Sequence, residues 1–161
     1  MKKPQIDEQA VVADGAVVLG DVTIEKNASI WYNAVIRGDV NSISIGEGTN
    51  IQDLAVLHVD ADAPLSIGQN VTIGHGAILH GCTIKDQALI GMGAIVLNGA
   101  EIGKGSMIAA GALVPQNTVV PDGALYMGNP AKFRRMLTEE ELTANLKNAA
   151  NYIKESKDLN N

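Results

Sequence analysis

IKDQALIGMGAIVLNGAEIGKGSMI, residues 84–108, is the stretch that decides the fold, because an aliphatic residue occupies every sixth position. The period is marked by Ile84, Ile90, Val96, Ile102 and Ile108. An α-helix requires a period near 3.6 and a half-buried strand alternates every two residues, so neither explains a step of six. A hexapeptide repeat is the sequence signature of a parallel β-helix, in which short strands and turns stack around one continuous core.

The same period extends through most of the chain. Before residue 84 the aliphatic positions are Val12, Val18, Ile24, Ile30, Ile36, Ile45, Ile51, Leu57, Ile67, Ile73 and Leu79, and after residue 108 they are Val114 and Val120. The pattern resembles the left-handed parallel β-helix of hexapeptide-repeat proteins, in which three hexapeptides form one triangular coil. That resemblance implies an all-β solenoid of about six coils.

Two longer steps interrupt the period. The step from Ile36 to Ile45 is nine residues and the step from Leu57 to Ile67 is ten. We therefore expect loops at Asp39–Ser42 and Val59–Pro64. Insertions in a solenoid map to loops on one face, which is often the binding face.

The hexapeptide pattern stops after Val120, so we expect a β-helix over residues 1–125 and an exit segment with a C-terminal helix over 126–161. Thr138 and Glu141 form a capping-box pattern at the start of that helix. An apolar stripe at helical spacing predicts an amphipathic α-helix over about 139–157 that packs along the β-helix or a neighbouring subunit. The stripe residues are Leu142, Leu146, Ala149, Ala150 and Ile153.

Composition narrows the range of partners. The chain has 161 residues, enough for one domain, and is 46% hydrophobic but only 3% aromatic, which suits a narrow aliphatic core. Its net charge of -6 argues against nucleic acid or an anionic membrane as a partner. No signal peptide or membrane span is recognisable. The single cysteine, Cys82, is compatible with the cytoplasm, and its place two residues before Ile84 predicts burial in the core.

Stacking three hexapeptides per coil brings the histidines into columns. His58 and His80 each follow an aliphatic residue of the same column and should be neighbours on adjacent strands, about 4.8 Å apart. His75 falls in a different column, with Tyr32 and Asp53, and points to another face. His58 and His80 could begin a zinc site, but the third ligand would come from a neighbouring subunit. The alternative is three solvated surface histidines.

VIRGDVNSISIGEGTNIQDLAVLH, residues 35–58, and TIGHGAILHGCTIKDQALIGMGAIV, residues 72–96, together resemble the γ-class carbonic anhydrases. The resemblance implies a homotrimer in which His58 and His80 of one subunit and His75 of the next hold zinc. It also implies an ion pair between Arg37 and Asp53 across the interface.

Further roles follow from the same resemblance. Asp39 would support the ion-pair network, Gln52 would lie beside a water on the metal, and Tyr152 of the C-terminal helix would reach the site. Simpler roles stay open: Arg37 and Asp39 as a solvated turn, Gln52 and Asp53 as partners of turn backbone, and Tyr152 as a packing residue.

The implied activity is reversible hydration of carbon dioxide to bicarbonate by zinc-activated hydroxide, since three histidines leave one zinc position open. Iron or cobalt also accepts three imidazoles. The chain departs from some family members at Val40, at the short segment HVDADAP and at Lys154, so no proton shuttle is assigned, although Asp60 or Asp62 could substitute. Two rival functions remain. One is an acyl-CoA-dependent acyltransferase, suggested by GNPAK at 128–132, and the other is a catalytically weak metal-binding scaffold trimer.

Overall fold

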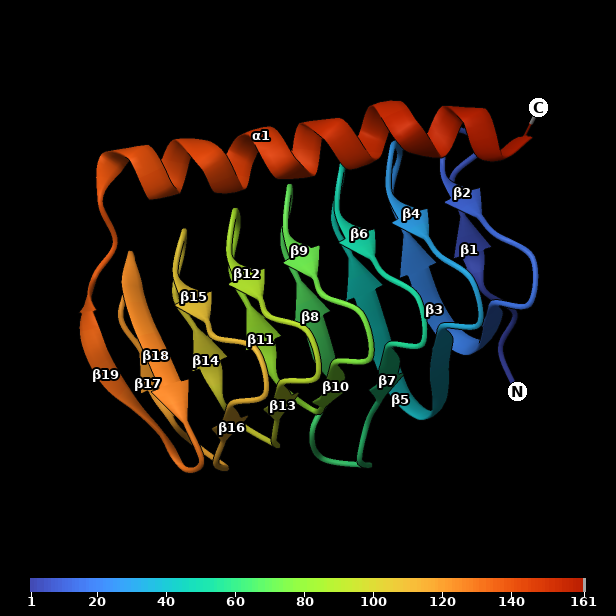
Figure 1. Ribbon diagram of the computed structural model, residues 1–161. Coiled ribbons are helices and arrows are strands. Elements are labelled where there is room, and N and C mark those ends of the chain that lie inside the picture. Colours follow the sequence, from blue (N-terminus) through green and yellow to red (C-terminus); the bar gives the residue numbers. More distant parts are fainter. Residues whose placement is uncertain (161) are drawn as a thin grey trace.

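Each hexapeptide folds into a short strand followed by a turn in the computed structural model, which describes residues 1–160. The strands stack in parallel register, and the chain winds as a β-helix from its N-terminal end to its C-terminal end, with one helix lying along its length (Figure 1). The aliphatic residue of each unit points inward. Ile36, Leu57 and Leu79, which share one column, are completely buried. The predicted parallel β-helix with a C-terminal helix is confirmed.

One face of the β-helix is an eight-stranded sheet. Its strands are β2 (Val11–Val12), β4 (Ser29–Ile30), β6 (Asn50–Ile51), β9 (Thr72–Ile73), β12 (Leu89–Ile90), β15 (Met107–Ile108), β18 (Ala124–Gly128) and β19 (Ala131–Met136). The first seven are parallel, which gives about seven coils where the sequence predicted about six. The difference arises because the six-residue period continues beyond the aliphatic series, to Tyr126 in β18.

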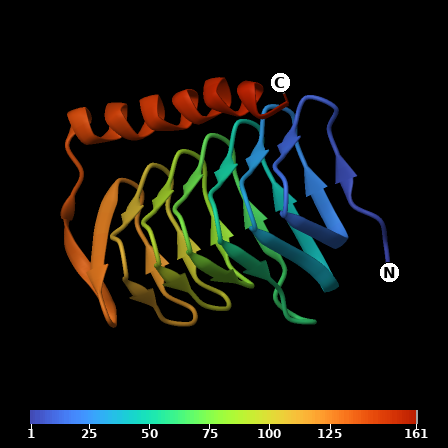
Figure 2. The ribbon, with the colours of Figure 1, turned by 45° about the vertical axis from the view of Figure 1, so that its right-hand side comes forward.

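The other two faces belong to one eleven-stranded sheet. Its strands are β1 (Gln5–Ile6), β3 (Val17–Ile24), β5 (Val35–Ile45), β7 (Val56–His58), β8 (Leu65–Ile67), β10 (Ile78–His80), β11 (Thr83–Ile84), β13 (Ile95–Val96), β14 (Glu101–Ile102), β16 (Leu113–Val114) and β17 (Val119–Val120). The long strand β5 joins the two faces, because its first residues pair with β7 and its last residues pair with β8 (Figure 2).

The two interruptions of the period differ in structure. Residues 39–42, expected to be a loop, lie inside the continuous strand β5, where the register with β3 shifts opposite Gly20 and Val22. The expectation of a separate loop there was wrong, because β3 and β5 stay paired on both sides of the extra residues. Residues 59–64 do form a loop, closed by an antiparallel bridge between Asp60 and Ala63.

The exit segment is more regular than the sequence indicated. β18 continues the parallel sheet and β19 returns antiparallel beside it, so that a hairpin closes the last coil. Tyr126 and Phe133 pack edge to face across this hairpin, with ring centroids 6.1 Å apart. The hairpin delivers the chain to the start of the helix.

The helix α1 (Glu139–Ser156) begins as predicted, with Thr138 and Glu141 forming the capping box, and it is followed by a 3₁₀ turn at Lys157–Asn160. Arg135 pairs with Glu141, and the resulting hydrogen bonds lower the pKa of Glu141 to about 2. The predicted stripe is only partly correct. Ala149 is buried, but Ala150 is exposed and Leu146 is 40% exposed, because α1 rests on a single edge of the β-helix. No helix within residues 1–160 is long and apolar enough to cross a membrane.

Candidate metal centre

The parallel pairing of β7 with β10 places two histidines side by side. His58 stands opposite His80 in the ladder, as the predicted column requires. The Nδ1 atom of His58 lies 3.0 Å from the Nε2 atom of His80, and the two rings meet at 70°. Both side chains are partly buried, and two imidazole nitrogens thus face each other.

Asp39 lies on the outer side of His58. The Nε2 atom of His58 is 2.9 Å from Oδ1 of Asp39, and Arg37 donates a hydrogen bond from Nη1 to the other carboxylate oxygen. The hydrogen bond with His58, and after it the one from Arg37, holds the pKa of Asp39 below its ordinary value. Asp39 and Arg37 are therefore joined to the histidine pair within one chain.

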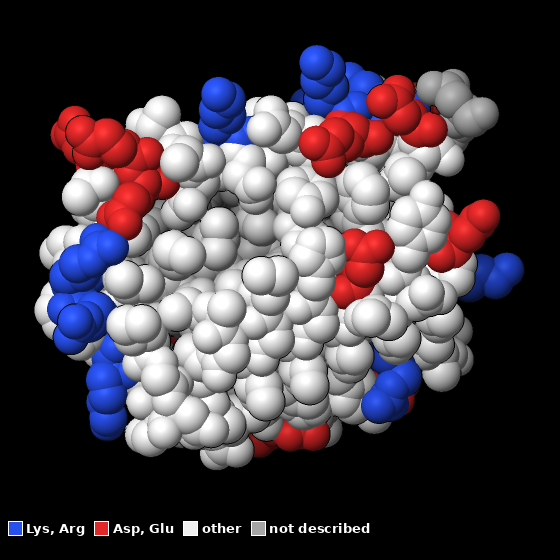
Figure 3. Space-filling model, in the orientation of Figure 1, with Lys and Arg blue, Asp and Glu red and all other residues white. Residues whose placement is uncertain are grey.

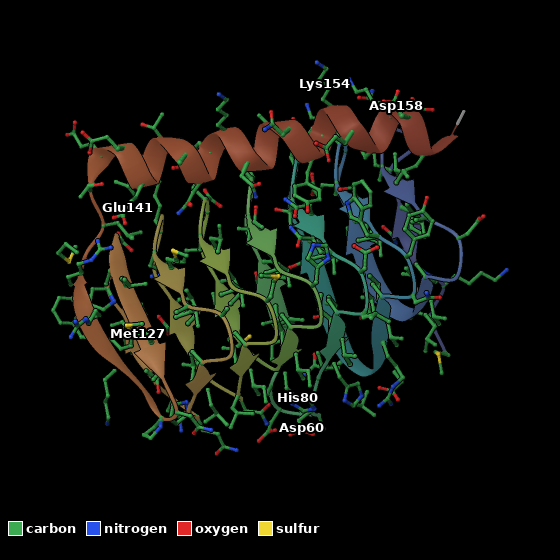
Figure 4. The ribbon with its side chains drawn as sticks, in the orientation of Figure 1. Asp60, His80, Met127, Glu141, Lys154 and Asp158 are labelled. Atoms are coloured by element: carbon green, nitrogen blue, oxygen red, sulfur yellow. The ribbon has the colours of Figure 1, made fainter. Side chains whose placement is uncertain are left out.

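Asn98 and Asp60 lie on the outer side of His80. The Nδ1 atom of His80 is 2.6 Å from Oδ1 of Asn98, and Nδ2 of Asn98 donates to Oδ2 of Asp60, also at 2.6 Å. Figure 4 shows His80 and Asp60 together at the same edge of the molecule. Asn98 was not predicted as a site residue. Its position one coil after His80 was the only sequence signal for it, and asparagine also occurs at many ordinary turns of this chain.

His75 lies in the turn after β9, away from the histidine pair, in the column that contains Asp53. Its Nδ1 atom is 2.9 Å from Oδ2 of Asp53. Gly76, which follows with a φ of +66°, completes a turn that an L side chain would strain. The predicted separation of His75 from His58 and His80 is thus seen in the fold. Among residues 1–160, no three His, Cys, Asp or Glu side chains come together to hold a metal ion.

Gln52 is buried beside His75. Its Oε1 atom accepts a hydrogen bond of 3.1 Å from the backbone N–H of His75, and its Nε2 atom donates to Oδ1 of Asn50 at 3.0 Å. The predicted pairing of Gln52 with turn backbone is therefore present. These two bonds use the amide oxygen and one of the two amide N–H groups. These two hydrogen bonds hold the side chain in place beside His75.

Tyr152 of α1 lies across a groove from this surface. The groove has a volume of about 310 Å³ and is lined by Gln52, His75, Met92, Met107, Asn148 and Tyr152, among others. Tyr152 packs edge to face on Trp31 with ring centroids 5.3 Å apart, and burial, followed by the charges of Glu155 and Asp53, raises its pKa. Tyr152 thus packs against Trp31 and also lines the groove beside His75.

Comparisons with known proteins identify the family of the chain. The chain is 53% identical over 154 residues to a probable carbonic anhydrase of Methanocaldococcus jannaschii, and the match covers 96% of this chain and 97% of that protein. The chain belongs to the γ-carbonic anhydrase family. It is also 51% identical to gamma carbonic anhydrase 2, mitochondrial, of Arabidopsis thaliana, where the match covers 94% of this chain but 57% of the plant protein. The chain thus spans little more than half the length of that relative.

Two further likenesses concern the fold of this γ-carbonic anhydrase family member. Residues 81–116 match the bacterial transferase hexapeptide (six repeats) family. A crystal structure of a hexapeptide transferase family protein from Anaplasma phagocytophilum is 51% identical, with a TM-score of 0.93 and coverage of 96% of this chain and 91% of that one. The β-helix and its C-terminal helix are therefore shared with a solved relative.

Proposed function

We propose that this protein is a zinc-dependent carbonic anhydrase that interconverts carbon dioxide and bicarbonate at a site shared by two subunits. The observation that carries the proposal is the facing pair of nitrogens, His58 Nδ1 and His80 Nε2, 3.0 Å apart. The outer nitrogen of each ring already faces an oxygen atom, of Asp39 and of Asn98. Metal-binding histidines usually donate their other N–H to such an oxygen, so the donor set fits a metal ion.

The spacing also fits zinc. Two nitrogens on one tetrahedral zinc, each at about 2.0–2.1 Å, lie about 3.3 Å apart, close to the separation seen here. A third imidazole is needed, and within one chain His75 lies on another face. We propose that His75 of a neighbouring subunit completes the set, and that iron or cobalt could replace zinc.

The outward-facing residues support a trimer in which this face is covered. One outward column is entirely aliphatic, from β3 to β16, and consists of Val17, Val35, Val56, Ile78, Ile95 and Leu113. The corresponding column on the next face carries mostly hydroxyl and charged side chains, namely Thr23, Ser44, Ser66, Thr83, Glu101 and Val119. The face seen in Figure 3 likewise has a broad uncharged centre, with most of its charges toward the edges.

An aliphatic column adjoining the histidine column indicates a surface that another protein covers, since outward positions of a solvated sheet are usually polar. A second copy of the same chain is the partner that also brings a histidine, from the His75 face. A contact between two different faces of identical chains closes into a ring when the rotation permits, and a ring of three would bring each His75 to its neighbour's pair.

Within such a site, the residues around the metal would have different roles. A zinc ion, when bound, lowers the pKa of a water molecule to about 7. The remaining N–H of Gln52 would donate to an oxygen of the substrate, because the hydrogen bonds to Asn50 and His75 hold its amide in place. Asp39 and Arg37 keep His58 oriented. The groove below Tyr152 gives a small apolar molecule a place beside His75.

The hydration assay tests the proposal. The purified protein should bind one zinc ion per chain and accelerate carbon dioxide hydration in a stopped-flow pH-indicator assay. Removal of zinc by a chelator should abolish the activity, zinc should restore it, and His80→Gln should be inactive, while the exposed control Gln116→Ala should not change it. A zinc-loaded protein with no hydration above buffer would exclude the function and leave a metal-binding scaffold.

Acyl transfer from acyl-CoA is a second candidate, favoured by one observation. His75 and Asp53 form a pair beside an open groove, which is an arrangement suited to a general base. The Anaplasma protein is also described as a hexapeptide transferase family protein. Saturable binding of coenzyme A in calorimetry, lost in His75→Gln, would favour this candidate over the carbonic anhydrase.

A further inference from the structure

The hydrogen-bond chain Asp60–Asn98–His80 can be assigned a direction without seeing any hydrogen atom. An ionised carboxylate only accepts hydrogen bonds, so the Asn98 atom 2.6 Å from Asp60 must be the amide nitrogen. The amide oxygen of Asn98 therefore faces His80. Asp60 thus decides which way the amide of Asn98 is turned.

The direction of the amide decides the proton position on His80. An amide oxygen only accepts, and it lies 2.6 Å from Nδ1 of His80, so Nδ1 must carry the proton. In a neutral imidazole the other nitrogen, Nε2, then has a lone pair and no hydrogen. That lone pair points toward Nδ1 of His58.

The same reasoning applies to His58 from the opposite side. The carboxylate of Asp39 accepts from Nε2 of His58, which in a neutral imidazole leaves Nδ1 without a proton. Two lone pairs therefore face each other across 3.0 Å, an arrangement that a shared cation relieves and that two neutral rings alone do not favour.

We propose that Asn98 is a positioning residue that holds His80 in the Nδ1–H tautomer, and that Asp60 orients Asn98 for this task. For neutral rings the tautomer follows from the hydrogen bonds, and its consequence for zinc rests on the proposed function. Without Asn98, His80 would move its proton to Nε2 and donate it to His58. The two rings would then satisfy each other, and the metal would have to break that bond.

The tautomer is measured first, on the metal-free protein labelled with ¹⁵N-histidine. In the wild type, Nδ1 of His80 should have the nitrogen shift of a protonated atom, with the signal assigned by its absence in His80→Gln. Asn98→Leu keeps the branched shape and the number of heavy atoms of the side chain but has no acceptor, and should shift Nδ1 toward the unprotonated value. An unchanged Nδ1 shift in Asn98→Leu would overturn the proposal.

Zinc affinity, measured by competition with a chelator, is the second readout. Asn98→Leu should weaken zinc binding about 10–100-fold, the range typical for loss of a residue that orients a metal ligand. The trimer mass should stay the same, which separates this effect from loss of assembly. Wild-type affinity in Asn98→Leu would contradict the positioning role.

An exchange of the two side chains gives a sharper test. Asp60→Asn alone frees the amide of Asn98 to turn over and should weaken zinc binding. In the double variant Asp60→Asn/Asn98→Asp, one carboxylate oxygen at position 98 accepts from Nδ1 of His80. The other carboxylate oxygen accepts from the amide N–H at position 60. This variant should regain most of the lost affinity, and a double variant that binds zinc no more tightly than Asp60→Asn would count against the proposal. If even the wild type binds no zinc, the proposed function fails, while the nitrogen shifts still decide the tautomer.

Discussion

Single residues of this protein take their chemistry from their place in the hexapeptide. Cys82 occupies an inward position, is almost fully buried, and has its pKa raised to about 12 by that burial. Only two residues earlier, His80 faces outward and meets His58 and Asn98. A difference of two positions thus separates an inert core thiol from a candidate metal ligand.

Cys82 should therefore be unreactive in the folded protein. The thiolate is the nucleophilic form of cysteine, and a pKa near 12 with no access for a reagent leaves almost none of it at pH 8. Iodoacetamide at pH 8 should add no mass to the native protein within an hour and should label it fully in denaturant. Rapid labelling of the native protein would show that the coil around Cys82 opens readily.

Arg37 bears on the proposed interface. Within the chain it pairs with Asp39, while Asp53 pairs with His75, so the predicted ion pair between Arg37 and Asp53 would have to form between subunits. Arg37→Ala should dissociate the proposed trimer or weaken its zinc binding, because it leaves two carboxylates without their cation.

Light scattering and metal analysis measure both outcomes of Arg37→Ala. Lys26→Ala is a matched control, since it removes a cation that pairs with Glu47 on the surface, and it should change neither. An intact, fully metallated Arg37→Ala trimer would mean that Arg37 is only a surface residue.

The sequence predicted the histidine columns because parallel strands stack with a fixed register, so the distance along the chain sets the neighbour. It did not predict Asn98, because the partner of His80 depends on how the loop at 59–64 presents Asp60. It also could not show that Asp39 bonds to His58, since that contact depends on where the strand β5 bulges. Loop geometry of this kind has no period to follow.

Among the elements, α1 is the one whose start is most clearly defined. Thr138 accepts from the backbone N–H of Glu141, and Glu141 accepts from the backbone N–H of Thr138. The sequence predicted this start, because the capping box is a local pattern. It missed the β18–β19 hairpin, because Pro- and Gly-rich stretches usually mark an exit rather than strands.

Thr138→Ala should destabilise the start of α1 by about 1 kcal/mol, the typical cost of losing an N-cap side chain. Urea unfolding should show a lower midpoint, and amide exchange should be faster over residues 139–144. Thr143→Ala is the control, because Thr143 lies exposed within the same helix and alanine has the higher helix propensity. Equal exchange rates in Thr138→Ala and the wild type would argue that packing alone holds this end of α1.

At the scale of the whole molecule, the β-helix separates the parts of the candidate site. The histidine pair lies at the ends of β7 and β10, and His75 lies in the turn after β9, beside the groove under α1. One chain therefore presents two incomplete halves, with an aliphatic column next to the pair. In the proposed ring of identical chains, the two halves from different faces would come together as one site.

The most direct test of a shared site is zinc binding by mixed subunits. His58→Ala and His75→Ala proteins should each form trimers of three 16.8 kDa chains that bind no zinc tightly. When equal amounts are unfolded together and refolded, an interface between a chain with intact His58 and a chain with intact His75 regains all three ligands. Random assembly gives this combination at about a quarter of the interfaces, since each of the two positions is filled correctly half of the time. The account predicts that zinc binding returns to about a quarter of the wild-type amount, and mixtures that bind no more zinc than either variant alone would contradict it.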